Sequence, residues 1–185
     1  MPATTGQARI AEMADALPRE FLEYSADKLR QLSGRIESCL GTLSEEQVWA
    51  RGSENENAIG NLVLHLGGNV RQWIVAGVGG APDMRERDQE FAARDAVPVP
   101  ELVERLRATV AQAVAVLDRV TAERLAQRIV VQEYEMSVLS AIYHVVEHFS
   151  GHTGQIIFAT KMLTGSDLGF YRHLRTTVAH GEKTP

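Results

Sequence analysis

Two histidines four residues apart are the strongest chemical signal in the sequence. His148 and His152 lie in a segment whose apolar residues recur with a helical period, so their side chains leave one helix face about 5–6 Å apart. Two imidazoles at this spacing can bind one metal ion, for the same reason that the H-E-x-x-H motif does. At about 100° per residue, both fall within the apolar arc of that helix, where an unpaired polar group is costly. The pattern favours a metal site over the alternative, two core histidines that are hydrogen-bonded to other side chains.

A third ligand would have to come from another segment. His65 is the only histidine between residues 58 and 76, and Asn61, Asn69 and Gln72 share its side of a predicted helix. Two interpretations are open at this point. Either these amides line a pocket and orient a histidine ligand or a substrate, or they mark the solvated face of the helix and His65 binds nothing.

Four further residues are candidates for the surroundings of the site. His144 continues the four-residue spacing but falls past the edge of the apolar arc, beside Gln155, so we expect both in a pocket or second shell. Asp88 and Glu90 belong to the charged segment 83–97. They are candidates for a catalytic base or a hydrogen-bond acceptor if this segment folds over the mouth of the fold. A solvated surface connection is the alternative.

The elements that must position these residues are helices. Four segments carry a helical period, and no run alternates convincingly with the period of two typical of strands. Residues 128–134 are the one place for a short strand or extended link, and Pro18 fits a first helical turn. The pattern predicts an all-α protein, an antiparallel four-helix bundle. The predicted helices span residues 18–43, 58–76, about 100–117 and 137–163.

The sequence predicts one domain with a short tail. We assign residues 1–163 to a single bundle domain and residues 164–185 to a polar, loosely held C-terminal tail. His173 and His180 lie in that tail and are expected to be solvated. Gly151 and Gly154 leave small residues on the outer side of the last helix, which predicts close contact with another helix there, including a dimer interface.

The composition excludes several classes of protein. The 185 residues are 44% apolar and 23% charged, as in a soluble globular protein. The net charge of −5 argues against nucleic-acid binding, which needs a basic face. The single cysteine, Cys39, excludes an intramolecular disulfide and a multi-cysteine zinc site. No signal peptide and no segment able to span a membrane is evident, so a cytoplasmic location is expected.

Two motifs resemble those of a known family. The segment Asn61–Asn69 and the pattern His148-x-x-x-His152-x-Gly-Gln are similar to the second-helix and fourth-helix signatures of the DinB-like metal-binding bundles. Residues 87–91 are similar to an acidic loop in an uncharacterised branch of that family. The likeness runs from the first helix to Leu163, and the fourth-helix motif is the more specific of the two.

The resemblance implies a fold, a ligand set and a class of activity. It implies an up-down-down-up four-helix bundle, usually a homodimer, in which His65, His148 and His152 hold a divalent metal, commonly zinc or nickel. Characterised members of the family transfer or isomerise groups through low-molecular-weight thiols such as mycothiol and bacillithiol, so a small-molecule partner is implied.

Three hypotheses about function follow. Three neutral imidazoles leave a coordination position open, as in catalytic zinc sites, which favours a metal-dependent transferase, such as a thiol-dependent S-transferase, or a hydrolase. The first alternative is a non-catalytic metal-binding or interaction bundle. The second is a bundle whose histidines are ordinary core residues and which binds no metal.

Overall fold

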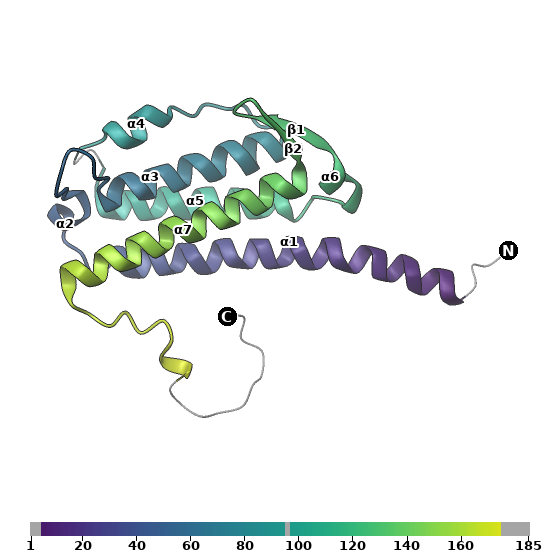
Figure 1. Cartoon of the computed structure of the whole chain (residues 1–185), viewed down its shortest axis with the longest axis horizontal. Coiled ribbons are helices and arrows are strands. Elements are labelled where there is room, and N and C mark those ends of the chain that lie inside the picture. The colour runs from purple at the N-terminus through teal and green to yellow at the C-terminus, as the bar shows by residue number, and fades with distance from the viewer. Residues whose placement is uncertain (1–4, 95–96, 175–185) are drawn as a thin grey trace.

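Four long helices make up most of the chain in this computed structural model, which describes residues 5–94 and 97–174, with side chains from residue 16 onward. They are α1 (Thr5–Leu40), α3 (Ile59–Val70) continued by the π-helix η1 (Arg71–Val78), α5 (Val99–Leu117) and α7 (Val138–Thr164). The prediction of an all-α four-helix bundle is confirmed (Figure 1). The short elements are α2 (Glu45–Trp49), α4 (Arg87–Ala92), α6 (Ala122–Ala126), β1 (Arg128–Val131), β2 (Tyr134–Ser137) and η2 (Arg172–Leu174).

The helices form two parallel pairs that are antiparallel to each other. α1 and α7 run in one direction and α3 and α5 in the other (Figure 1), which is the up-down-down-up order that the resemblance implied. α3 and α5 are parallel neighbours, so after η1 the chain must return to the other end of the bundle before α5 begins. The distance is roughly 30 Å, the length of a helix of about 20 residues. Residues 79–98, which we call the crossover, make this return and include α4.

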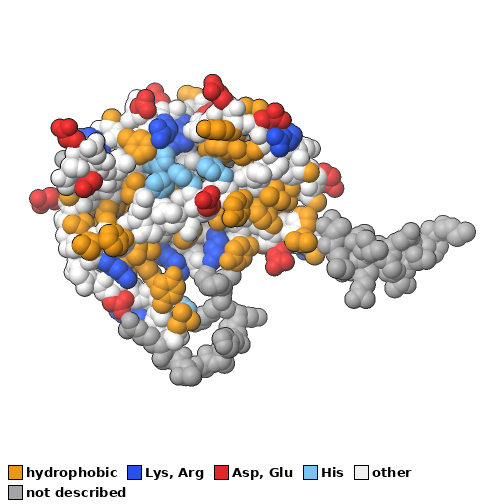
Figure 2. Space-filling model, viewed as in Figure 1, with side chains coloured by type: hydrophobic (Ala, Val, Ile, Leu, Met, Phe, Trp, Pro, Cys, Tyr) orange, Lys and Arg blue, Asp and Glu red, His pale blue; other side chains and the backbone are white. Residues whose placement is uncertain are grey.

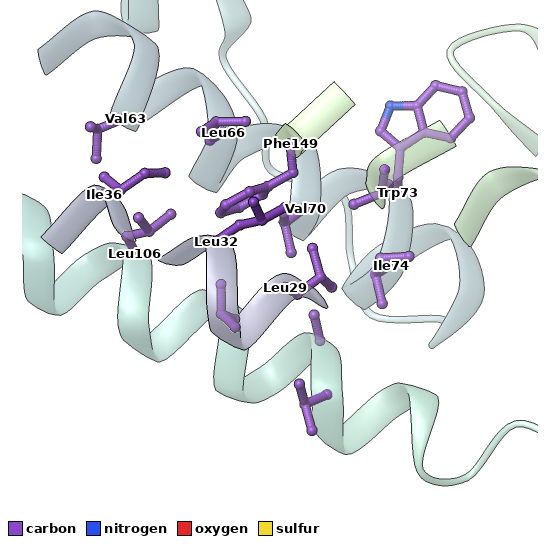
Figure 3. Packing of buried hydrophobic residues seen from close by; sticks show 14 of the residues in the cluster. Leu29, Leu32, Ile36, Val63, Leu66, Val70, Trp73, Ile74, Leu106 and Phe149 are labelled. Atoms are coloured by element: carbon purple, nitrogen blue, oxygen red, sulfur yellow. The ribbon is translucent and has the colours of Figure 1, made fainter. Parts of the chain in front are cut away.

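The core is a single apolar cluster between the four helices. Phe149 of α7 is fully buried and lies close to Leu32, Leu66 and Val70 in Figure 3. Such a closely packed interior leaves little freedom to the helices, so side chains at the edge of the cluster are held in fixed positions.

The first helix is longer than predicted. It begins at Thr5, not near Pro18, and ends at Leu40, so Pro18 lies inside the helix. Residues 7–17 are rich in Ala, Glu, Met and Leu, which favour helix strongly enough to extend it in front of the proline. A proline there removes one backbone hydrogen bond but need not end the helix.

A β-hairpin occupies the region where a short strand or link was expected. β1 and β2 pair antiparallel, with Val131 opposite Tyr134, and the two turn residues Gln132 and Glu133 both have positive φ angles, 50° and 67°. Two positive φ values are typical of a type I′ turn, which usually carries Asn-Gly. Gln-Glu is not such a pair, so local sequence patterns do not predict this turn. The hairpin packs on η1, where a Cβ on Gly77 would lie 2.6 Å from Val131.

A short part of the chain beyond α7 packs on the bundle. Leu168 and Phe170 are partly buried against the core, and the Arg35 guanidinium lies 5.6 Å from the Phe170 ring centre. Residues 168–170 are therefore held against the bundle, whereas residues 165–167 and 171–174 are exposed. His173 is exposed, as expected, and His180 lies outside the described residues. The division into residues 1–163 and 164–185 stays a prediction.

None of the helices in the described ranges is both long enough and apolar enough to cross a membrane.

Candidate metal centre

Three histidines from two helices meet at one edge of the bundle. One ring nitrogen each of His65, on α3, and of His148 and His152, on α7, lie within 4.8 Å of one another. The Nε2 atoms of His65 and His148 are 3.0 Å apart. Two imidazole nitrogens on one tetrahedral zinc ion, each about 2.0–2.1 Å from the metal, are about 3.3–3.4 Å apart. The spacing therefore fits a shared ion with only small side-chain movements.

Hydrogen bonds at the far side of two rings select the tautomer that binds metal. His65 Nδ1 lies 2.9 Å from Glu90 Oε2, and His152 Nδ1 lies 2.8 Å from Gln155 Oε1. Both partners are acceptors, so each Nδ1 carries the proton and each Nε2 keeps its lone pair. This arrangement of an outer acceptor behind a histidine is usual around bound metals.

Glu90 is held in place by Arg85. The Arg85 guanidinium donates from Nε to Oε1 at 2.7 Å and from Nη2 to Oε2 at 2.8 Å, and the side chains are only 4% and 10% exposed. Nη2 also lies 3.1 Å from His65 Nδ1. Because Nη2 already donates to Glu90 Oε2, we assign the proton to His65 Nδ1, which donates it to the same carboxylate. Burial raises the pKa of Glu90, but hydrogen bonds from Arg85 and His65 outweigh it and lower the pKa, so the carboxylate is ionised.

Two of the three imidazoles are kept neutral by their surroundings. Burial, with the neighbouring His152 and His65, lowers the pKa of His148 to about 4. Burial also lowers the pKa of His152, although its hydrogen bond to Gln155 acts in the opposite direction. Only the neutral ring offers a lone pair to a metal, so both side chains are in the ligating form at neutral pH.

Asn61 ties the crossover to α3. Its Nδ2 donates to the carbonyl oxygens of Glu90 at 2.8 Å and Ala93 at 3.0 Å, while its Oδ1 accepts from Ala58 N and from Arg51 Nη2. The side of α3 that carries Asn61 and His65 is therefore buried under the crossover, so the expectation that it is a solvated face is wrong. Asn61 anchors the segment that carries Glu90.

The sequence matches one family model over most of its length. That model, described as a protein of unknown function (DUF1572), covers residues 16–175. The chain belongs to the DUF1572 family. No curated protein matches it significantly.

Solved structures show that the fold of this DUF1572 chain is DinB-like. A DinB-like protein from Bacillus subtilis is 14% identical and superposes with a TM-score of 0.62, covering 80% of this chain and 96% of the other. A DinB-like protein from Bacillus cereus is also 14% identical, with a TM-score of 0.59 over 74% and 88% of the two chains. A conserved protein from Enterococcus faecalis is 16% identical, with a TM-score of 0.67 over 78% and 97%. The DinB-like fold and the three histidines are together compatible with a metal site.

The 100° projection places the two α7 histidines of the DUF1572 chain inside the apolar arc, but the structure does not. Both are half-buried at its edge, facing α3. The buried stripe runs instead through Phe149, Thr153 and Ile156, one position away. Thr153 is tolerated in this stripe because its hydroxyl donates to the carbonyl of Phe149, 2.8 Å away in the same helix.

The remaining predicted residues lie at different distances from the three histidines. Asn69 is buried and lines a cavity with His144, whose ring centre is 5.7 Å from that of His148. Asp88 is exposed on α4, and in the described part of the chain no contact links it to the three histidines. Arg85 is the residue that sequence reasoning missed, because nothing in a charged run indicates which arginine will be buried.

Gly151 and Gly154 lie open on the outer side of α7. A Cβ built on either would meet no atom within 4 Å. The predicted contact with another helix is therefore not made by the residues of this chain that the structure describes.

Proposed function

We propose that this chain is a metal-dependent enzyme in which His65, His148 and His152 bind one divalent ion, zinc or nickel. One observation carries the proposal: three imidazoles converge within 4.8 Å, and two of them have their outer nitrogen engaged by an acceptor. Three nitrogen donors suit either metal.

We propose further that the reaction is the thiol-dependent transfer of a group to or from a small molecule. An ion with three protein ligands has a position left for a thiol or water, and it lowers the pKa of the group bound there. Glu90 and Gln155 orient the metal ligands, because Glu90 contacts the imidazole of His65 and Gln155 that of His152. We assign neither predicted acid as a base, since Glu90 is held by Arg85 and His65, and Asp88 is exposed on α4.

Elemental analysis tests the ligand set. Wild type, His65→Ala and His173→Ala are each dialysed against limiting zinc or nickel, and bound metal is measured beside a circular-dichroism spectrum. We expect about one equivalent in wild type and His173→Ala, and at least a tenfold loss in folded His65→Ala, because two imidazoles are a poor site. Equal metal content in all three proteins would contradict the proposal.

A second measurement separates an enzyme from a non-catalytic metal-binding module. In cobalt-substituted protein, a small thiol such as 2-mercaptoethanol should add a thiolate-to-metal absorption band if a coordination position is open. An unchanged spectrum would mean that the ion is fully coordinated by protein and would favour the module.

We also propose that two copies pair through the outer face of α7. This face combines the open Gly151 and Gly154 with the exposed Tyr143 and Phe158, which are 61% and 68% exposed. Small residues allow helices to approach closely, and the flanking aromatic rings supply apolar area.

The pairing is tested by Gly154→Leu in sedimentation experiments. We expect wild type to sediment as a dimer and the variant as a monomer. Gly34→Leu is the matched control, because Gly34 is an exposed helical glycine with no atom within 4 Å of an added Cβ. A monomeric wild type, or a dimer unaffected by Gly154→Leu, would contradict the pairing.

A further inference from the structure

A cavity of about 370 Å³ adjoins the three histidines and includes the side chains of His65 and His148 in its lining. Its other walls come from η1, the crossover and the hairpin. Figure 2 shows the histidine side chains reaching the surface on this face, with a Lys or Arg side chain beside them. A molecule in this cavity would therefore lie next to the proposed metal.

The charged residues that line the cavity are both arginines. Arg85 and Arg87 contribute to the lining and no carboxylate of a described residue does, although the chain as a whole carries a net charge of −5. Arg85 is neutralised by Glu90. Arg87 is exposed, its guanidinium lies 4.9 Å from the centre of the Phe91 ring, and it forms no ion pair with a described acidic residue. The cavity thus offers one uncompensated positive charge, which suits an anion.

The inner wall holds two buried polar atoms that lack a partner. Trp73 Nε1 and Asn69 Oδ1 form no hydrogen bond within the described residues, and both side chains line the cavity from neighbouring turns of the same helical segment. Trp73 is 2% and Asn69 4% exposed. A buried donor or acceptor left unpaired is rare in folded proteins and costs about 1–3 kcal/mol. Their position points to a ligand that completes this wall.

The walls that would contact such a ligand are fixed by a shared hydrogen bond. Gln72 Oε1 accepts from Arg85 Nη1 at 2.9 Å and from Gln132 Nε2 at 2.6 Å. Gln72 thereby links the crossover to the hairpin turn. The link holds Tyr134 and Met136 of β2, which line the cavity, close to the arginines of the crossover. A preformed wall lowers the entropy lost on binding.

From these observations we infer that the cavity binds a small organic anion with an aromatic or apolar body. Its anionic group pairs with Arg87 and accepts a hydrogen bond from Trp73 Nε1, and its body packs against Tyr134 and Met136. This inference deepens the proposed function. It rests on that function in one respect: the bound anion is a substrate only if the neighbouring histidines hold a catalytic metal. Binding of the anion itself does not require the metal.

Indole signals in a ¹H–¹⁵N NMR spectrum test the binding. The chain has two tryptophans, and Trp49 Nε1 donates to the carbonyl of Val97 at the other end of the bundle, 3.2 Å away, so its signal is an internal reference. Phenylacetate and the neutral phenylacetamide are titrated into the full chain, first after chelator treatment and then after zinc loading. We expect phenylacetate to shift the Trp73 signal and leave that of Trp49, with an affinity at least about fivefold above that of the amide.

A pair of charge variants then locates the anion. Arg87→Gln should lower the affinity for phenylacetate by about three- to tenfold, to that of the amide, because it removes the free cation. Arg105→Gln changes the net charge equally but lies on α5, where Arg105 pairs with Glu101, and should leave the affinity unchanged. An unmoved Trp73 signal, equal affinity for amide and carboxylate, or equal effects of the two variants would overturn the inference.

The chelator-treated titration keeps this result separate from the proposed function. A carboxylate cannot bind through a metal that has been removed, so a response of Trp73 there reports the cavity alone. If the protein binds no metal but still selects phenylacetate, the metal proposal fails and the cavity remains. If metal binds and the cavity does not respond, only this inference fails.

Discussion

Two regions of the bundle bury polar side chains, and they satisfy them in opposite ways. Along α1 and α7, the hydroxyls of Ser25, Thr153 and Thr160 each donate to the carbonyl four residues earlier in the same helix. On the buried side of α3, the polar partners are distant in sequence. Asn61 binds Glu90 and Ala93, 29 and 32 residues away, and His65 meets His148, 83 residues away.

The two regions differ in whether a buried polar group depends on the rest of the fold. A hydroxyl that bonds its own helix needs nothing from the rest of the fold, so it fits an apolar core at little cost. The network on α3 exists only when α3, the crossover and α7 are all in place. Each of its members would be expensive to bury alone, and together they hold three imidazole nitrogens at one point.

The largest effect should come from breaking the buried ion pair. Arg85→Ala leaves the Glu90 carboxylate buried with only His65 as a partner, so we expect a loss of about 3–5 kcal/mol in the free energy of unfolding, measured by urea denaturation. Arg105→Ala removes an arginine from an exposed pair with Glu101 and should cost less than about 1 kcal/mol. Similar losses in both variants would mean that the network on α3 does not contribute specially to stability.

An intermediate effect is expected on metal affinity when the acceptor behind His65 is weakened. Glu90→Gln keeps the shape of the side chain but removes its charge, so we expect zinc affinity to fall by about 10- to 100-fold, measured by competition with a chromophoric chelator. Glu86→Gln is the control, because Glu86 is an exposed glutamate of the same segment. An unchanged affinity in Glu90→Gln would show that the contact with His65 is not needed to orient a ligand.

The smallest effect should be found in the locally satisfied region. Thr153→Val removes a hydroxyl that bonds only its own helix, so we expect the free energy of unfolding to change by less than about 1 kcal/mol. Asn61→Leu, by contrast, leaves the Ala58 N–H and the carbonyls of Glu90 and Ala93 without this partner and should cost at least about 2 kcal/mol. Thermal and urea unfolding of the two variants compare the regions directly, and a costlier Thr153→Val would reverse the distinction.

Local patterns predicted the helices well and the covering segments poorly. The apolar period located α3, α5 and α7 to within a few residues, because a helix that buries one face must repeat about every 3.6 residues. The start of α1 and the hairpin were missed, since a proline and an unusual turn pair gave misleading or weak local signals. For the charged segment 83–97, the sequence leaves open whether it folds over the mouth of the bundle or is a solvated connection. Its Arg85 and Glu90 are buried all the same, because the parallel order of α3 and α5 forces the chain back across the polar side of α3.

The sequence by itself therefore determined the fold class, the family and the pairing of His148 with His152, since each depends on patterns that are local to single segments of the chain. Only the tertiary structure decided that His65 faces that pair and that Asn61 anchors the crossover. It also decided that Glu90, and not Asp88, contacts the Nδ1 atom of His65. Those relations join residues 25 to more than 80 positions apart. Helical periodicity carries no information at that range, so they appear only when the chain is folded and the cost of burying polar groups selects their partners.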